Sequence, residues 1–134
     1  MSNSTVYPDV SDVLFIHTEM IALFGGRAGV RDYFLLDSAL SRPNATFGGS
    51  DLYPSIFEKA AALIQSLILN HPFDDGNKRS ALAACALFLH LNEYKVMLPT
   101  KESIQFTLNI DNHSLALDQI AAWLEKHVKK EKKK

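Results

Sequence analysis

Apolar residues recur with helical spacing through most of this chain. Residues 55–70 carry them three and four positions apart, at Ile56, Ala60, Leu63, Ile64, Leu67 and Ile68. This spacing is typical of a largely buried helix, and residues 80–91 are apolar almost all round, as expected of a central helix in a bundle. Further helices are predicted over 12–24, from Asp32 or the next residue to a point before Arg42-Pro43, over 100–110 and over 115–128. The pattern predicts an all-α bundle of about six helices.

Small polar residues mark the expected ends of these helices. The candidate N-caps are Ser11, Asn77, Thr100 and Ser114, and the candidate stops are Gly25-Gly26 and Asn92. Residues 43–54 are too rich in turn-forming residues for a helix, and they predict a β-hairpin or an Ω-like loop. Residues 93–98 are expected to form a short extended piece.

The loop between the two buried helices concentrates the polar chemistry of the chain. Residues 70–79 supply a histidine, two carboxylates, an amide and two cations. A proline and a glycine prevent a continuous helix, so the second helix should begin near Asn77 with unpaired N–H groups facing the loop. Lys78 and Arg79 add positive charge to that first turn, where the helix dipole disfavours each cation by about 0.3–1 kcal/mol. A bound anion such as phosphate would relieve this conflict.

Two more residues of the loop fit phosphate chemistry. Asp75 is suited to hold Mg²⁺, which commonly binds one or two carboxylates together with the phosphates of a substrate. His71 is suited to accept a proton, because histidine changes its charge near neutral pH. The same residue types are also what any helix-to-helix turn prefers. Composition alone therefore leaves a purely structural turn open.

Composition and charge limit the other possibilities. The chain has 134 residues, 47% of them hydrophobic, which is enough for one domain over 1–134 with its own core. The net charge is −1, but five of the fourteen basic residues fall in 129–134. The rest is mildly acidic, which argues against a nucleic-acid surface and makes the tail a disordered basic end. No secretion signal or membrane-spanning run is evident, so a cytoplasmic location is expected.

Four side chains outside the loop are assigned structural roles. Cys85 lies in the most apolar helix and is expected to be a buried thiol, not a nucleophile. His17 lies among apolar residues and is expected to be a core histidine satisfied by a neighbour. Arg31 and Asp32 are expected to tie down the loop that they end.

Residues 71–79, His-Pro-Phe-Asp-Asp-Gly-Asn-Lys-Arg, closely resemble the signature loop of the Fic/Doc family. Four other segments resemble the death-on-curing branch of that family, the toxins of bacterial toxin–antitoxin pairs. These segments are 24–32, 35–43, 53–55 and 58–62. Two departures from the adenylyl-transferring Fic proteins point to the same branch. Those proteins have Gly where this chain has Lys78, and a second Arg where it has Leu82.

The resemblance implies a helical bundle with a β-hairpin flap near 43–54, where an extended segment of the target protein pairs edge to edge. It implies transfer of the γ-phosphoryl group of ATP to a Ser or Thr hydroxyl, with elongation factor Tu as the implied target and arrest of translation as the outcome. His71 would be the general base and Asp75 the Mg²⁺ ligand. The other implied catalytic and nucleotide-binding residues are Gly76, Asn77, Lys78 and Arg79. Phe73 is expected to anchor the loop in the core, and Asp74 to point to solvent.

Two alternatives stay open at this stage: adenylyl transfer on the same scaffold, and a catalytically silent bundle that only binds a partner. The inhibitory motif of the family places Ser or Thr four residues before a Glu, and no Glu of this chain is preceded in that way. A separate antitoxin with a helix-forming tail is therefore expected to restrain the protein. Direct binding to nucleic acid or membrane is not expected.

Overall fold

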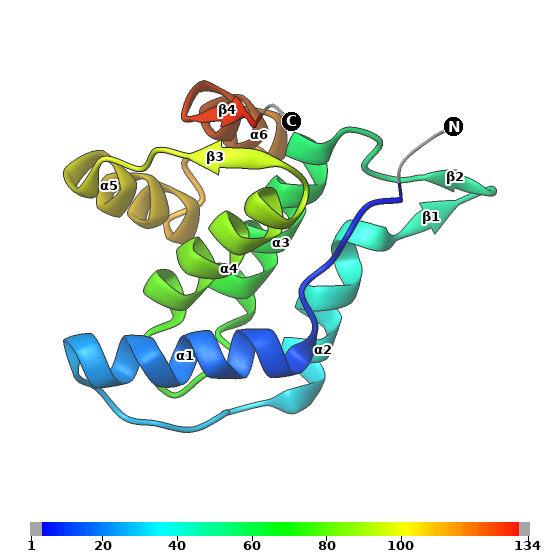
Figure 1. Cartoon of the computed structure of the whole chain (residues 1–134). Coiled ribbons are helices and arrows are strands. Elements are labelled where there is room, and N and C mark those ends of the chain that lie inside the picture. Colours follow the sequence, from blue (N-terminus) through cyan, green and yellow to red (C-terminus); the bar gives the residue numbers. More distant parts are fainter. Residues whose placement is uncertain (1–3, 132–134) are drawn as a thin grey trace.

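The computed structural model describes residues 4–131, which form six α-helices and two small antiparallel sheets (Figure 1). The helices are α1 (Val10–Phe24), α2 (Tyr33–Ser41), α3 (Ile56–Asn70), α4 (Asn77–Leu91), α5 (Thr100–Asp111) and α6 (Leu117–Lys126), with a 3-10 helix η1 (Arg42–Asn44). The strands are β1 (Thr46–Phe47), β2 (Ser50–Asp51), β3 (Tyr94–Val96) and β4 (Val128–Lys130). The predicted all-α bundle of about six helices with a small hairpin is confirmed.

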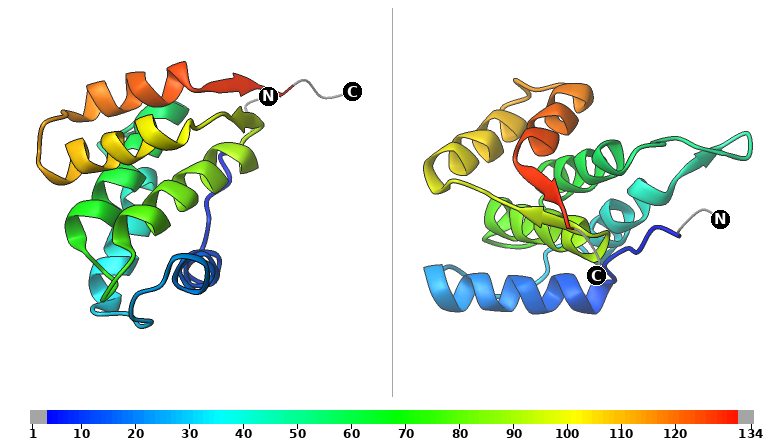
Figure 2. Two further views of the ribbon diagram at one scale, coloured as in Figure 1. Left: turned by 90° about the vertical axis from the view of Figure 1, so that its left-hand side faces the viewer. Right: turned by 45° about the horizontal axis from the view of Figure 1, so that its top comes forward.

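Helices α3 and α4 form the centre of the bundle. They pack against each other, α1 crosses one side of α4, and α5 and α6 lie on the opposite side of the central pair (Figure 2). Most side chains of α3 are buried, which accounts for its mostly apolar composition. The helix starts with a capping box between Ser55 and Glu58, each of which accepts the other's backbone N–H. Within residues 4–131 none of the helices is long and apolar enough to cross a membrane.

The start of α1 differs from the prediction. Its N-cap is Asp9, not Ser11, so the helix begins at Val10. The Asp9 carboxylate accepts the N–H of Asp12, and the Asp12 carboxylate accepts the N–H of Asp9. This reciprocal pair satisfies two N–H groups, whereas the Ser11 hydroxyl donates to Asp9. The predicted stops at Gly25 and Asn92 are confirmed, and α2 begins at Tyr33, within its predicted start, with Asp32 as the N-cap.

The starts of the last two helices are also corrected. Thr100 is the first residue of α5 and Pro99 takes the cap position, so the predicted cap is wrong by one residue. Ser114 does not cap α6, because its N–H and hydroxyl are bonded to the side-chain oxygen of Asn112. The helix begins only at Leu117.

The predicted hairpin at 43–54 is present as β1 and β2. Its turn is Gly48-Gly49, with φ of 59° and 83°, values that two-residue hairpin turns require and that residues with a Cβ rarely adopt. The base of the hairpin is fixed to α3 by the buried Lys59, whose Nζ lies 3.0 Å from Asp51 Oδ2. This contact balances a lysine charge that would otherwise be costly to bury.

The short extended piece predicted at 93–98 is confirmed as β3, but the sheet that it forms with a second strand was not predicted. β3 pairs with β4, with Tyr94 opposite Lys130 and Val96 opposite Val128. The prediction of a disordered tail is therefore wrong for residues 129 and 130, which complete this sheet beside the end of α4. Residues 132–134 of that predicted tail lie outside the described residues.

Cys85 is buried in α4, as predicted. Loss of hydration raises the pKa of its thiol to about 12, so the thiolate is scarce at neutral pH. We expect Cys85 in the native protein to react with a chromogenic disulfide reagent at least tenfold more slowly than in the protein unfolded in denaturant. Equal rates in the two states would show that the thiol is accessible.

Candidate active site

The signature loop joins the two central helices through two residues in the left-handed backbone region. His71 ends α3 with φ 48° and ψ 57°, and Gly76 caps α4 with φ 74°. A left-handed histidine is uncommon and marks a strained position, of the kind that collects at functional sites. The positive φ favours glycine at position 76. Glycine also leaves room for α1, because a Cβ there would lie 3.3 Å from the Ile21 side chain.

The loop before α2 holds the strained backbone in place. Arg31 Nε donates to the carbonyl of His71 over 2.7 Å, and Arg31 Nη2 donates to that of Asn70 over 2.8 Å. The N–H groups of Arg31 and Asp32 both donate to the carbonyl of Pro72, over 2.7 and 3.1 Å. The expectation that Arg31 and Asp32 have a structural role is confirmed, although the segment that they tie down includes the signature loop itself.

The inner side of the loop is bound to the core by Phe73. This ring is 2% exposed and stacks on His17, with 3.8 Å between ring centroids. His17 Nε2 lies 2.8 Å from the carbonyl oxygen of Asp75, and because a carbonyl only accepts, this nitrogen carries the proton. Both structural predictions, for Phe73 and for His17, are confirmed. Asp74 is exposed, also as predicted.

Asn77 does not cap α4, as the sequence suggested, but is its first residue. Its side-chain oxygen accepts the N–H of Phe73 and its amide nitrogen donates to the carbonyl of Phe73, both over 3.0 Å. The amide therefore closes the loop on itself. The cap passes to Gly76, which has no side chain to occupy the helix end.

A groove of about 340 Å³ opens between the start of α4 and the side of α5. It is lined by Gly76, Asn77, Lys78, Arg79 and Leu82 from α4 and its cap, and by Ile104, Thr107 and Leu108 from α5. In the described part of the chain, the N–H groups of Asn77, Lys78 and Arg79 have no hydrogen-bond acceptor. Unpaired amides, a positive helix end and two cations together suit a phosphate-bearing ligand.

Arg79 lies at the outer edge of this groove. Its guanidinium stacks over the ring of Phe24, 4.4 Å from the centroid, an arrangement that holds the cation through the ring quadrupole. The end of α1 thereby holds the side chain of Arg79, a residue that also lines the groove.

Asp75 faces the other side of the loop, toward the turn after α1. Its Oδ2 accepts the N–H of Arg27 over 3.0 Å, and a Cβ on Gly26 would lie 3.2 Å from its carboxylate. One carboxylate oxygen is thus held and Oδ1 remains for another ligand. Residues 4–131 contain no cluster of three or more His, Cys, Asp or Glu that could hold a metal. Asp75 therefore fits only a cation that takes its other ligands from phosphate and water, as Mg²⁺ does.

The structure adds one residue that the sequence did not point to. Asp111, the last residue of α5, places Oδ1 3.4 Å from His71 Nε2 and Oδ2 3.4 Å from Lys78 Nζ. Its charge is at a helix C-terminus, where the dipole disfavours an acid by about 0.3–1 kcal/mol. That misplaced charge is the one sequence signal that could have drawn attention to it.

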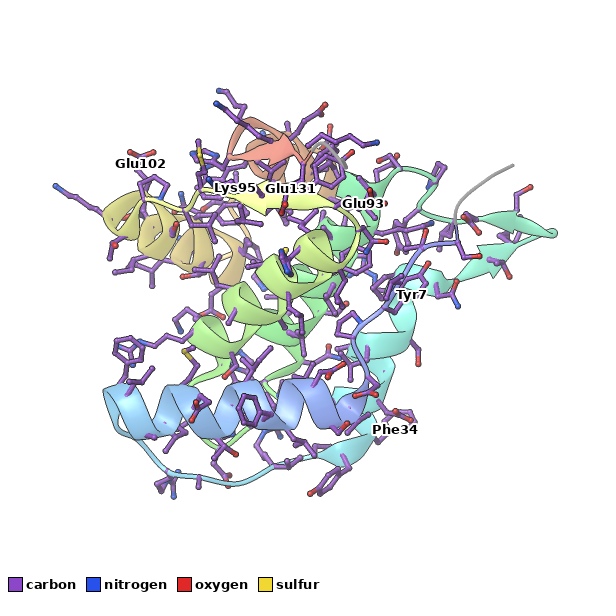
Figure 3. The ribbon with its side chains drawn as sticks, viewed as in Figure 1. Tyr7, Phe34, Glu93, Lys95, Glu102 and Glu131 are labelled. Carbon is purple, nitrogen blue, oxygen red and sulfur yellow. The ribbon has the colours of Figure 1, made fainter. Side chains whose placement is uncertain are left out.

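The predicted site residues thus fall into two groups. Gly76, Asn77, Lys78 and Arg79 line the groove, and Asp111 links His71 to it through Lys78. Asp75 directly precedes Gly76 in the loop, but its side chain points toward Arg27. A larger, shallow depression of about 550 Å³ lies far from this loop, beside the β3–β4 sheet. Lys95 and Glu131 line it and lie near each other (Figure 3). It contains no residue of the signature loop.

Comparison with known proteins gives matches that include the signature loop. The sequence profile of the Fic/DOC family matches residues 7–89. The chain is 54% identical over 88 residues to "Toxin Doc" of Mycolicibacterium smegmatis, a match that covers 66% of this chain and 65% of that protein. It is 24% identical over 115 residues to "Protein kinase doc" of Escherichia phage P1, covering 86% of this chain and 90% of that protein. The chain thus spans just under two thirds of the mycobacterial relative.

Proposed function

Because this chain belongs to the Fic/DOC family, we propose that it transfers the γ-phosphoryl group of ATP to a Ser or Thr hydroxyl of a protein. The observation that carries the proposal is the groove at the start of α4, where unpaired N–H groups, Lys78 and Arg79 meet beside His71. The phage relative, named a protein kinase, supports the same type of reaction.

In the proposed reaction His71 takes the proton of the substrate hydroxyl as its oxygen bonds to the γ-phosphorus. The bond from that phosphorus to the bridging oxygen breaks, and ADP leaves. Lys78, Arg79 and the free N–H groups of the first turn stabilise the negative charge of the transferring group, a task for which fixed cations and amides are effective. Asn77 contributes by keeping the loop closed on Phe73. Mg²⁺ held by Asp75 would supply further neutralisation of the phosphates.

Lys78 favours phosphoryl over adenylyl transfer. Lys78 lines the groove and its side chain reaches Asp111 at the end of α5, with 3.4 Å between Nζ and Oδ2. In adenylyl-transferring relatives a glycine leaves this space open for the triphosphate. Here the lysine fills it and adds a charge, which we propose reverses the direction in which the nucleotide binds. Leu82 further lowers the polarity of the wall where those proteins have a second arginine.

The donor group can be identified by labelling. We expect a bacterial lysate incubated with this protein and γ-labelled ATP to show one predominant labelled protein, and the same incubation with α-labelled ATP to show none. Lys78→Gly should lower γ-label transfer at least tenfold, because it removes a cation from the phosphate site. Transfer of the α label without the γ label would refute the phosphoryl proposal and establish adenylyl transfer. If neither label is transferred and the purified protein does not bind Mg²⁺-ATP, the alternative of a catalytically silent, partner-binding bundle is correct.

We also propose that the protein is a toxin that acts in the cytoplasm and is restrained by a cognate antitoxin. The mycobacterial relative is named a toxin, and the chain lacks the family's inhibitory motif. The exposed apolar residues Ile104 and Leu108 line the groove, and the exposed Phe24 stacks on Arg79. A helical tail could cover them. Elongation factor Tu is the proposed target, docked along the β1–β2 hairpin.

A further inference from the structure

We propose that Asp111 is a positioning residue that fixes the ring orientation and the tautomer of His71. The proposal rests on the phosphotransferase function above, since it assigns a partner to the general base of that reaction. Asp111 belongs to α5, beyond the residues 7–89 that match the family profile. Its role is therefore inferred from contacts alone.

The Asp111 carboxylate lies beside one edge of the His71 ring. Asp111 Oδ1 is 3.4 Å from Nε2 of His71, and the two side chains are 30% and 46% exposed. The backbone of His71 is fixed by Arg31, so the direction in which its side chain leaves the backbone is set. A carboxylate on one edge of the ring then determines which nitrogen faces α5 and which faces away.

The position of the carboxylate also identifies which ring nitrogen carries the hydrogen in neutral His71. An ionised carboxylate only accepts hydrogen bonds, so the nitrogen that faces it must carry the hydrogen. Neutral His71 is then the Nε2–H tautomer, and Nδ1 is left with the lone pair that accepts the proton of the substrate hydroxyl. After that transfer both ring nitrogens carry hydrogen, and the resulting positive charge lies beside the negative charge of Asp111. The carboxylate thus favours the state that forms during the reaction.

The same carboxylate makes a second contact, with Lys78. Asp111 Oδ2 accepts a hydrogen bond from Lys78 Nζ over 3.4 Å. One carboxylate of α5 therefore lies between the general base and a cation of the groove. Both distances exceed the 2.7–2.9 Å typical of strong charge-assisted hydrogen bonds. Contacts of this kind are often long without substrate and shorten in the reactive complex.

The tautomer can be measured without any activity assay. In the nitrogen-15 NMR spectrum of the whole protein, we expect His71 to show a protonated Nε2 and an unprotonated Nδ1 at pH above 7.5. His71→Gln identifies the signals among those of the five histidines. Asp111→Ala should produce a mixture of tautomers, and Asp111→Asn, which keeps an acceptor but no charge, an intermediate result. Asp37→Ala, which removes an exposed carboxylate of α2, should leave the His71 signals unchanged.

The rate of transfer provides the second readout. At saturating Mg²⁺-ATP we expect Asp111→Ala to lower the kcat for γ-phosphoryl transfer about 10- to 100-fold, while the KM for ATP changes less than about threefold. A role limited to holding Lys78 would instead raise the KM and leave the His71 tautomer as in the unmodified protein.

These outcomes separate the two proposals. Unchanged His71 signals in Asp111→Ala overturn the positioning role, whatever the rate does. A changed tautomer with an unchanged kcat overturns it as well. If the unmodified protein transfers no label to any protein, the proposed function fails, but the NMR comparison still shows whether Asp111 sets the state of His71.

Discussion

His71→Ala should lower the rate of phosphoryl transfer by about 10²–10⁴, the range that general-base assistance contributes. Nucleotide affinity and fold should remain nearly unchanged, because His71 does not line the groove and its ring is about half exposed. The backbone strain at φ 48° is present with either side chain, so the substitution adds little conformational cost. Single-turnover transfer of γ label measures the loss, and growth arrest on expression of the protein should disappear with it.

A matched control is available on the neighbouring helix. His90 is an exposed histidine of α4 whose ring Nδ1 lies 3.8 Å from Glu131 Oε1, far from the signature loop. His90→Ala should therefore transfer label and arrest growth like the unmodified protein. If growth arrest survives His71→Ala undiminished, His71 is not the base and the catalytic proposal is wrong.

The features that could be predicted from the sequence are local ones. The central helices follow from apolar spacing within each segment, and the hairpin follows from the turn-forming residues of 43–54. The signature loop gathers most of its polar groups within ten positions, so its chemistry was visible without knowledge of the fold. Phe73 is the one large apolar residue of 70–79, and it was recognisable as the residue that turns inward.

The features that were missed depend on contacts between distant segments. Asn77 is an acceptable N-cap by residue type, but the backbone of Phe73 takes both polar atoms of its side chain. Asp111 approaches Lys78 from 33 residues further along the chain, and no local pattern records that approach. β4 is rich in lysine and has no apolar alternation, so only the presence of β3 beside it explains why it is extended.

The position of Asp75 shows how the fold refines a prediction about a ligand. The sequence identified a carboxylate suited to Mg²⁺ but not its direction. In the structure one oxygen is held by Arg27, and residues 4–131 contain no cluster of three or more His, Cys, Asp or Glu that could hold a metal. A metal at this point depends on phosphate for most of its ligands, so Mg²⁺ should bind measurably only together with nucleotide.

Phe73→Ala should lower the free energy of unfolding by about 3–5 kcal/mol, the usual cost of replacing a buried phenylalanine with alanine. Phe73 is 2% exposed and stacked on His17, and its backbone is the partner of Asn77. The cavity would therefore lie directly beneath the signature loop. Since small domains are stable by only about 5–15 kcal/mol, the variant should be markedly destabilised, and its loop should bind nucleotide weakly even where it folds.

Denaturant titration followed by circular dichroism measures the change, with nucleotide binding recorded on the folded fraction. Phe34→Ala is the matched control, because Phe34 is also a phenylalanine but lies at the start of α2 and is 78% exposed (Figure 3). Its effect should stay within about 0.5 kcal/mol. A loss of less than about 1 kcal/mol in Phe73→Ala would mean that the core closes over the cavity without cost. Phe73 would then not be the residue that holds the signature loop against α1. The fixed shape of the loop would have to come from the hydrogen bonds of Arg31 and Asn77.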